Sequence, residues 1–146
     1  MEKHELSQVT LSQLLGIQIP IIMAPMFLVS NTEMIIKALD SGITACIPAL
    51  NFRTTEELRK AIQLIKSKSD KPFGINLIVS KSNFLYKDQL TVCCEEKVGY
   101  IITSLGSPEE TIKQAHLKGI KVFCDVTDIK YAKKVEALGA NAVIAV

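Results

Sequence analysis

The chain has 146 residues, of which 48% are hydrophobic and 22% are charged, and its formal net charge is +2. This length suggests one domain, residues 1–146, that buries a core of ordinary size. The near-neutral charge gives no support to nucleic-acid binding, and no apolar run approaches the roughly 18 residues of a membrane span. The first residues lack the hydrophobic stretch of a secretory signal, so we expect a cytoplasmic protein with no membrane partner.

The predicted elements alternate between buried strands and amphipathic helices after a short helical or irregular lead-in. Ser30 and Glu33 have capping-box spacing, and Thr54 and Glu57 repeat it, so helices are expected to begin at both places. Helical segments show apolar side chains at i, i+3, i+4 and i+7. Strands are expected at 21–25, 43–47, 73–79, 98–103, 120–124 and 141–146, and helices at 31–40, 54–65, 84–97, 107–118 and 128–138.

Three glycines close successive predicted helices at intervals of 20 residues, and each precedes a buried strand. They are Gly99, Gly119 and Gly139. Strands that alternate with helices at this spacing indicate right-handed βαβ units and a parallel sheet. The periodicity alone does not separate a (β/α)8 barrel from a flavodoxin-like open sheet, because both folds repeat the same unit.

Four cysteines are present, and none of their spacings is that of a zinc site or a CxxC redox motif. Cys46 and Cys124 fall within apolar runs, where a free thiol packs as a small hydrophobic group, and Cys93 and Cys94 are adjacent. We expect structural thiols in a reducing compartment and no metal site. Redox or metal chemistry is the alternative.

The segment Pro20–Met26 is an apolar run between two prolines, which is typical of a buried strand that ends in a loop. Ligands of α/β proteins bind at the carboxyl ends of such strands. Asn76 is the polar member of another apolar run, and a buried amide must find hydrogen-bond partners. It either bonds the edge of a heterocycle or satisfies neighbouring backbone. Further polar residues that end strands are Thr103, Ser104, Asp125 and Thr127, and either Asp125 or Asp128 is expected to cap a helix.

The chain offers no nucleophile and base for a catalytic constellation. Its two histidines are His4, in the lead-in, and His116, on a predicted helix away from the strand ends. None of the common catalytic or nucleotide-binding motifs is present. We interpret His116 as a bystander on the surface.

Six segments occur in an order that is informative when they are taken together. They are Leu11–Ile17 (LSQLLGI), Pro20–Met26 (PIIMAPM), Gly74–Leu77 (GINL), Ser104–Pro108 (SLGSP), Lys121–Thr127 (KVFCDVT) and Ala132–Ile144. In this order and spacing the chain resembles the nitronate monooxygenase family. That family is also called 2-nitropropane dioxygenase-like and includes flavin-dependent enoyl-acyl-carrier-protein reductases.

The resemblance implies an FMN-binding (β/α)8 barrel, of which this chain forms about the first five and a half βα units. It implies that the catalytic histidine loop and the phosphate-binding turns lie beyond Val146. No catalytic residue is then expected in this chain, which alone would be inactive. The residues that the resemblance assigns to the cofactor are Ala24, Pro25, Met26, Asn76, Asp125 and Thr127.

Asp125 departs from the family pattern, in which Lys, Val or Thr is more usual. An acid beside a flavin pyrimidine ring would disfavour the anionic reduced form. The implied activity is oxidation of an alkyl nitronate by flavin and O2, and the close alternative is reduction of an enoyl thioester. An alternative of another class is a non-catalytic half-barrel that associates with a different chain or with itself as a homo-oligomer.

Overall fold

Six parallel strands form one sheet whose order follows the chain, β1-β2-β3-β4-β5-β6. The computed structural model describes residues 9–146, so His4 lies outside the described residues. An open doubly wound sheet reverses its strand order at a switch point, whereas a barrel keeps sequential neighbours. The fold is therefore a partial (β/α)8 barrel, as predicted. The strands are β1 (Ile22–Met23), β2 (Thr44–Pro48), β3 (Gly74–Ile78), β4 (Tyr100–Ser104), β5 (Lys121–Val126) and β6 (Ala142–Ala145).

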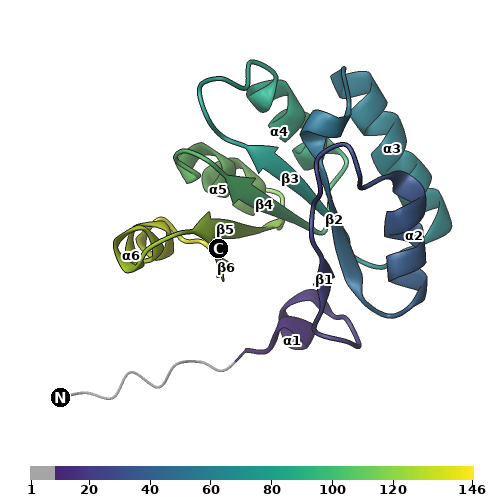
Figure 1. Cartoon of the computed structure of the whole chain (residues 1–146), viewed down its shortest axis with the longest axis horizontal. Coiled ribbons are helices and arrows are strands. Elements are labelled where there is room, and N and C mark those ends of the chain that lie inside the picture. Colours follow the sequence, from purple (N-terminus) through teal and green to yellow (C-terminus); the bar gives the residue numbers. More distant parts are fainter. Residues whose placement is uncertain (1–8) are drawn as a thin grey trace.

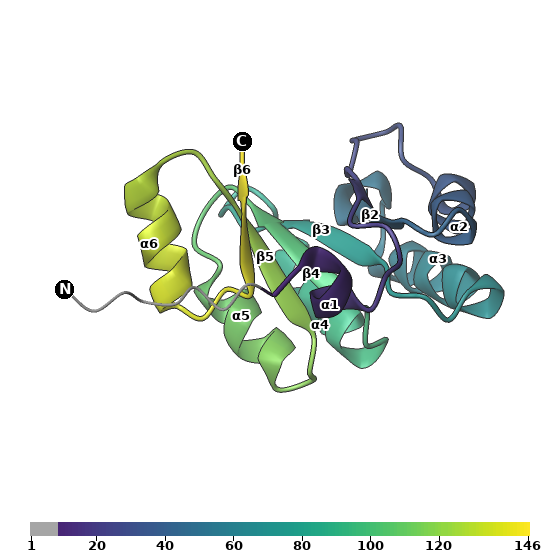
Figure 2. The ribbon, with the colours of Figure 1, turned by 90° about the horizontal axis from the view of Figure 1, so that it is seen from below.

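The helices lie on both sides of the curved sheet, but unequally. Figure 2 shows α2 to α6 along its convex side, with α1 alone in the hollow on the other side. Figure 1 shows the same arrangement, with the chain passing from one βα unit to the next across the sheet. The helices are α1 (Leu11–Leu15), α2 (Thr32–Asp40), the 3-10 turn η1 (Ala49–Asn51), α3 (Thr55–Lys68), α4 (Tyr86–Glu95), α5 (Glu109–His116) and α6 (Ile129–Ala137).

Alternate residues along each strand face the two sides of the sheet. On β3, Ile75 and Leu77 pack into the core beneath the outer helices. The inner side carries a smaller cluster, in which Leu15 of α1 meets Tyr100 and Phe123. The rings of Tyr100 and Phe123 are stacked, with their centroids 5.2 Å apart. The inner face of the half-barrel is thus filled near its base by aromatic side chains and α1.

The helix starts confirm one predicted cap and correct another. Thr54 caps α3 by accepting a hydrogen bond from the Glu57 amide at 3.2 Å, as its spacing predicts. The cap of α2 is Asn31 rather than Ser30, and its Oδ1 accepts from the Met34 amide at 3.0 Å. The Ser30 hydroxyl instead accepts from the Met26 amide, so it serves the preceding loop.

The glycine repeat has two physical origins. Gly119 and Gly139 have φ values of +72° and +97°, as expected of residues that end helices in the left-handed conformation. At the end of α4 that conformation belongs to Lys97, with φ +49°. Gly99 is needed for close packing instead, because a Cβ there would lie 2.8 Å from Cβ of Pro72.

The apolar pattern of the predicted helix 128–138 includes Ile129 and Val135, which predicts that both are buried. Val135 is fully buried, but Ile129 begins α6 and is exposed. Within residues 9–146, no helix combines the length and the apolar character that crossing a bilayer demands.

Candidate functional site

A line of hydrogen bonds connects three neighbouring strands near their carboxyl ends. Nδ2 of Asn76 on β3 donates to Oγ of Ser104 on β4 at 2.8 Å. Oγ of Ser104 in turn donates to Oδ2 of Asp125 on β5 at 2.5 Å. By strand alternation, these side chains share the inner face with Tyr100 and Phe123. The inner face at the carboxyl ends is where (β/α)8 barrels place their active sites, so we take this line as the candidate site.

Asn76 keeps one acceptor free among its contacts with the described residues. Its Nδ2 also donates to the Ile102 carbonyl at 3.1 Å, so both amide hydrogens are used. The hydrogen bonds of residues 9–146 include none that Oδ1 of Asn76 accepts, and none of their fully buried side-chain polar atoms lacks a partner. Oδ1 is therefore accessible from the surface. The amide therefore satisfies a neighbouring backbone carbonyl, the second of the two predicted roles, while its role toward a ligand stays a prediction.

The predicted residues of β1 lie on the loop that leads to α2. Ala24 and Met26 are exposed and Pro25 is half-buried. This loop is held by η1, the turn that follows β2. Oδ1 of Asn51 accepts from the Leu28 amide at 2.9 Å, and Nδ2 of Asn51 donates to the Ser30 carbonyl at 2.8 Å. The sequence shows Asn51 only as a loop residue, and nothing in its local pattern marks this role.

The other two predicted residues differ in their surroundings. Asp125 joins the line of hydrogen bonds, whereas Thr127 follows β5 and is exposed, and its side chain makes none of the hydrogen bonds found in residues 9–146. Asp128 is the helix cap of the pair, since its Oδ1 accepts from the Tyr131 amide at 2.7 Å. Ser104 also belongs to the line of hydrogen bonds. The sequence indicates it only as one of several polar residues that end strands.

Asn51 is expected to protect the Leu28 amide from hydrogen exchange. Removing its amide in Asn51→Ala frees the Leu28 N–H, and we expect hydrogen exchange at that amide to accelerate about tenfold, the equivalent of one lost hydrogen bond. Asn51→Asp keeps the acceptor and is expected to preserve most of the protection. The Gly119 amide, which donates to the His116 carbonyl at 3.0 Å and makes no hydrogen bond to this loop within residues 9–146, is the internal reference. Equal exchange at Leu28 in all three proteins would refute the clamp.

The four cysteines are free and buried, as predicted. Burial raises the pKa of the Cys46 thiol well above its ordinary value, with neighbouring Cys93 and Asp125 adding to the shift. Burial likewise raises the pKa of Cys93. A raised pKa disfavours the thiolate, which is the reactive form. Within residues 9–146, no group of three or more His, Cys, Asp or Glu side chains is placed to hold a metal ion.

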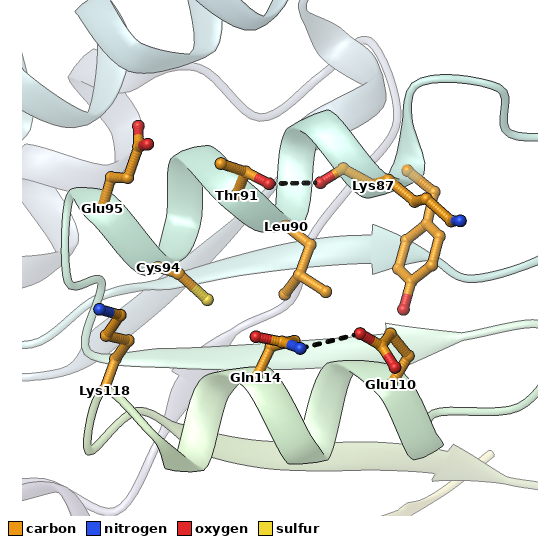
Figure 3. Close-up of a pocket in the computed structure, with 9 residues that line it drawn as sticks. Lys87, Leu90, Thr91, Cys94, Glu95, Glu110, Gln114 and Lys118 are labelled. Atoms are coloured by element: carbon orange, nitrogen blue, oxygen red, sulfur yellow. Dashed lines mark hydrogen bonds between the residues drawn. The ribbon is translucent and has the colours of Figure 1, made fainter.

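A groove of about 810 Å³ separates α4 from α5 on the outer side of the sheet (Figure 3). Leu90 and Cys94 line it from α4, and Gln114 and Glu110 face them from α5, joined by a hydrogen bond of 3.0 Å. Burial raises the pKa of Cys94, although Lys118 opposes the shift. The groove lies among outer helices and shares no lining residue with the line of hydrogen bonds, so it is not the candidate site.

His116 lies at the end of α5, where its Nε2 is 3.0 Å from Oδ1 of Asn141. The same Oδ1 accepts from the Val122 amide at 2.8 Å and so fixes the approach to β6. His116 belongs to this outer contact and takes no part in the candidate site.

No family model matches the chain. Over 134 residues the chain is 29% identical to (3aS,4S,5R,7aS)-5-hydroxy-7a-methyl-1-oxo-octahydro-1H-indene-4-carboxyl-CoA dehydrogenase of Rhodococcus jostii (strain RHA1), a match that covers 92% of this chain and 37% of the relative. It is 35% identical over 80 residues to a probable nitronate monooxygenase of Staphylococcus haemolyticus (strain JCSC1435), with 55% of this chain and 22% of the relative covered.

Two solved structures share the fold. FabK from Thermotoga maritima has a TM-score of 0.87 and 33% identity, over 94% of this chain and 43% of FabK. Nitroalkane oxidase from Streptomyces ansochromogenes has a TM-score of 0.81 over 93% of this chain and 48% of the oxidase, but at 22% identity this likeness concerns the fold alone. The chain spans less than half the length of each of these relatives.

Proposed function

This chain belongs to the nitronate monooxygenase and flavin-dependent enoyl-reductase family of oxidoreductases, and we propose on that ground that it forms the ring-binding part of an FMN-dependent enzyme. The observation that carries this proposal is the accessible Oδ1 of Asn76 at the inner carboxyl end of the sheet. An isoalloxazine ring has one N–H donor on its pyrimidine edge, which is the partner that such an acceptor requires.

The residues present fit a flat ring with one polar edge. Asn76 would accept from the ring N–H, while the Pro25–Met26 segment offers apolar and backbone surface at the same end of the sheet. Asn51 and Ser30 hold that segment in place through the hydrogen bonds described above. FMN, when bound, supplies the two-electron chemistry, and the described residues bind and orient its ring.

An enoyl or other acyl thioester is the substrate class that the observations favour. Loops at the carboxyl ends of β1, β3 and β4 expose large apolar side chains, with Leu28 75%, Phe84 94% and Leu105 71% exposed. An apolar rim of this kind suits a substrate with an extended hydrocarbon part. Two relatives that match over nine-tenths of the chain are a carboxyl-CoA dehydrogenase and FabK, an enoyl-acyl-carrier-protein reductase. The nitroalkane oxidase also covers 93% of the chain, but at 22% identity it supports the fold alone.

Oxidation of an alkyl nitronate by O2 is the second candidate. It is supported by the probable nitronate monooxygenase, which has the higher identity over a shorter stretch. The proposals differ in the direction of electron flow, since a nitronate reduces the flavin, whereas an enoyl thioester reoxidises flavin that has already been reduced. Association of the half-barrel with a second chain stays a prediction.

The test is a titration of the purified protein with FMN and with lumiflavin, which has the ring without the phosphate, followed by flavin fluorescence. We expect both to bind, and Asn76→Ala to weaken binding roughly fivefold to tenfold, the loss of about one hydrogen bond. Thr103→Val is the matched control, because it removes a hydroxyl from β4 on the opposite face.

If neither flavin binds the wild-type protein, the proposal fails. If flavin binds, anaerobic spectra decide the substrate class. Bleaching of the oxidised flavin by an alkyl nitronate supports the second candidate. Reoxidation of the reduced flavin by a medium-chain enoyl thioester supports the first.

A further inference from the structure

We propose that Ser104 and Asp125 are positioning residues that hold the Asn76 amide in one orientation, with Oδ1 presented to a hydrogen-bond donor of the ligand. The ligand's identity rests on the proposed function, whereas the orientation of the amide does not. The starting observation is the direction of the hydrogen bonds along the line from Asn76 through Ser104 to Asp125.

Asp125 determines which atoms donate and which accept along this line of hydrogen bonds. A carboxylate accepts hydrogen bonds and donates none, so the Ser104 hydroxyl must donate its single hydrogen to Oδ2 of Asp125. At 2.5 Å this is a short, charge-assisted bond, the kind that fixes a hydroxyl rotor most firmly. Oγ of Ser104 then has only lone pairs to offer to Asn76.

The amide of Asn76 therefore faces two acceptors on its Nδ2 side, Oγ of Ser104 and the Ile102 carbonyl. Turning the amide over would place Oδ1 against both of them and leave all three oxygens without a hydrogen between them. Asn76 is only 7% exposed, so water cannot readily supply the missing donors. Oδ1 is consequently held on the accessible side.

The neighbouring residue Thr103 shows that the arrangement is specific to the inner face. Its hydroxyl donates to the Phe123 carbonyl at 3.4 Å and is buried, and it takes no part in the line. Because strand neighbours face opposite sides, only Ser104 of these two adjacent hydroxyl residues can link Asn76 to Asp125.

A fixed acceptor matters for a ligand that presents a donor between two acceptors, as the pyrimidine edge of a flavin does. With the amide turned, an N–H would face the ligand's N–H, and one hydrogen bond would be replaced by a repulsion. Through these hydrogen bonds Ser104 and Asp125 act on the ligand by way of Asn76.

The experiment is 15N NMR of the ligand-free protein, in which the resonance positions and the hydrogen-exchange rates of the Asn76 side-chain NH2 group are measured. We expect Ser104→Ala to shift one of the two Hδ2 resonances and to speed the exchange of that hydrogen about tenfold, because one of two acceptors is gone. Asp125→Ala is expected to produce a smaller change of the same sign, since the freed hydroxyl can rotate. Ser104→Thr restores the hydroxyl and is expected to return the signals, while Thr103→Val leaves them unchanged.

Lumiflavin titrations of the same variants separate this inference from the proposed function. An Asn76 signal that changes in Ser104→Ala, together with weaker lumiflavin binding, supports both. A changed signal in a protein whose wild type binds no flavin supports the positioning role and overturns the FMN proposal. Asn76 signals identical in wild type, Ser104→Ala and Asp125→Ala overturn the positioning role, whatever binds.

Discussion

Gly74→Ala is expected to lower the free energy of unfolding by about 3 kcal/mol, because it forces a methyl group into a filled space. A Cβ at Gly74 would lie 2.2 Å from Cε2 of Tyr100, and the two residues are register partners on β3 and β4. The Tyr100 ring cannot swing aside, since it is fully buried, stacked on Phe123, and bonded through its hydroxyl to the Ala45 carbonyl at 3.0 Å. Urea unfolding followed by circular dichroism measures the loss.

Two further variants isolate the cause. Gly119→Ala introduces a methyl group into open space at φ +72°, so it carries only the cost of the left-handed conformation, about 1 kcal/mol. Tyr100→Leu removes the ring that the new methyl group meets. In that background Gly74→Ala should cost much less than in the wild type. A cost for Gly74→Ala no greater than that for Gly119→Ala would contradict the steric explanation.

Two buried thiols are expected to lower the free energy of unfolding by about 4 kcal/mol between pH 8 and pH 10. Burial raises the pKa of Cys46 and of Cys93, and both side chains are fully buried. In the unfolded chain a thiol loses its proton above a pH of about 8.5, while the folded protein retains it. The unfolded state thus binds fewer protons, and stability declines as the pH rises above that value. Below it, the full contribution is present.

Urea unfolding at pH 8, 9 and 10 in the presence of a reductant provides the measurement. Cys46→Ala and Cys93→Ala each remove one thiol, so each should make the fall in stability between pH 8 and pH 10 smaller by about 2 kcal/mol, whatever the variant's stability at pH 8. Lysine and tyrosine titrations are common to all three proteins and cancel in the comparison. A pH dependence unchanged in both variants would show that these thiols are not its source.

The element pattern could be predicted because each βα unit is encoded locally. The apolar runs and the glycines that follow the helices indicate the strands, and the family motifs indicate the barrel that the strand order confirms. The error at Ser30 is instructive, since its spacing to Glu33 is right for a cap. The Ser30 hydroxyl could accept from the Glu33 amide, as a helix cap, or from the Met26 amide. It accepts from the Met26 amide, because the loop after β1 folds back on itself.

The candidate site could be predicted only in part. Asn76 stands out as a buried amide in an apolar run, but the role of Ser104 depends on which of two adjacent hydroxyl residues faces inward. A shift of one residue in the strand would exchange Ser104 and Thr103, and composition does not fix that choice. The role of Asn51 is still harder to predict from the sequence, because its partners Leu28 and Ser30 lie more than 20 residues earlier in the chain.

The position of α1 has a consequence for the order in which the molecule assembles. Each strand pairs with the strand of the adjacent βα unit, so the sheet and its outer layer grow through contacts between near neighbours in sequence. Leu15 of α1, in contrast, packs with Tyr100 and Phe123 from the far side of the chain. Closing so long a loop has a high entropy cost until the strands that receive it are formed. We therefore expect α1 to dock late in folding, after the strands that form the inner face of the sheet are in place.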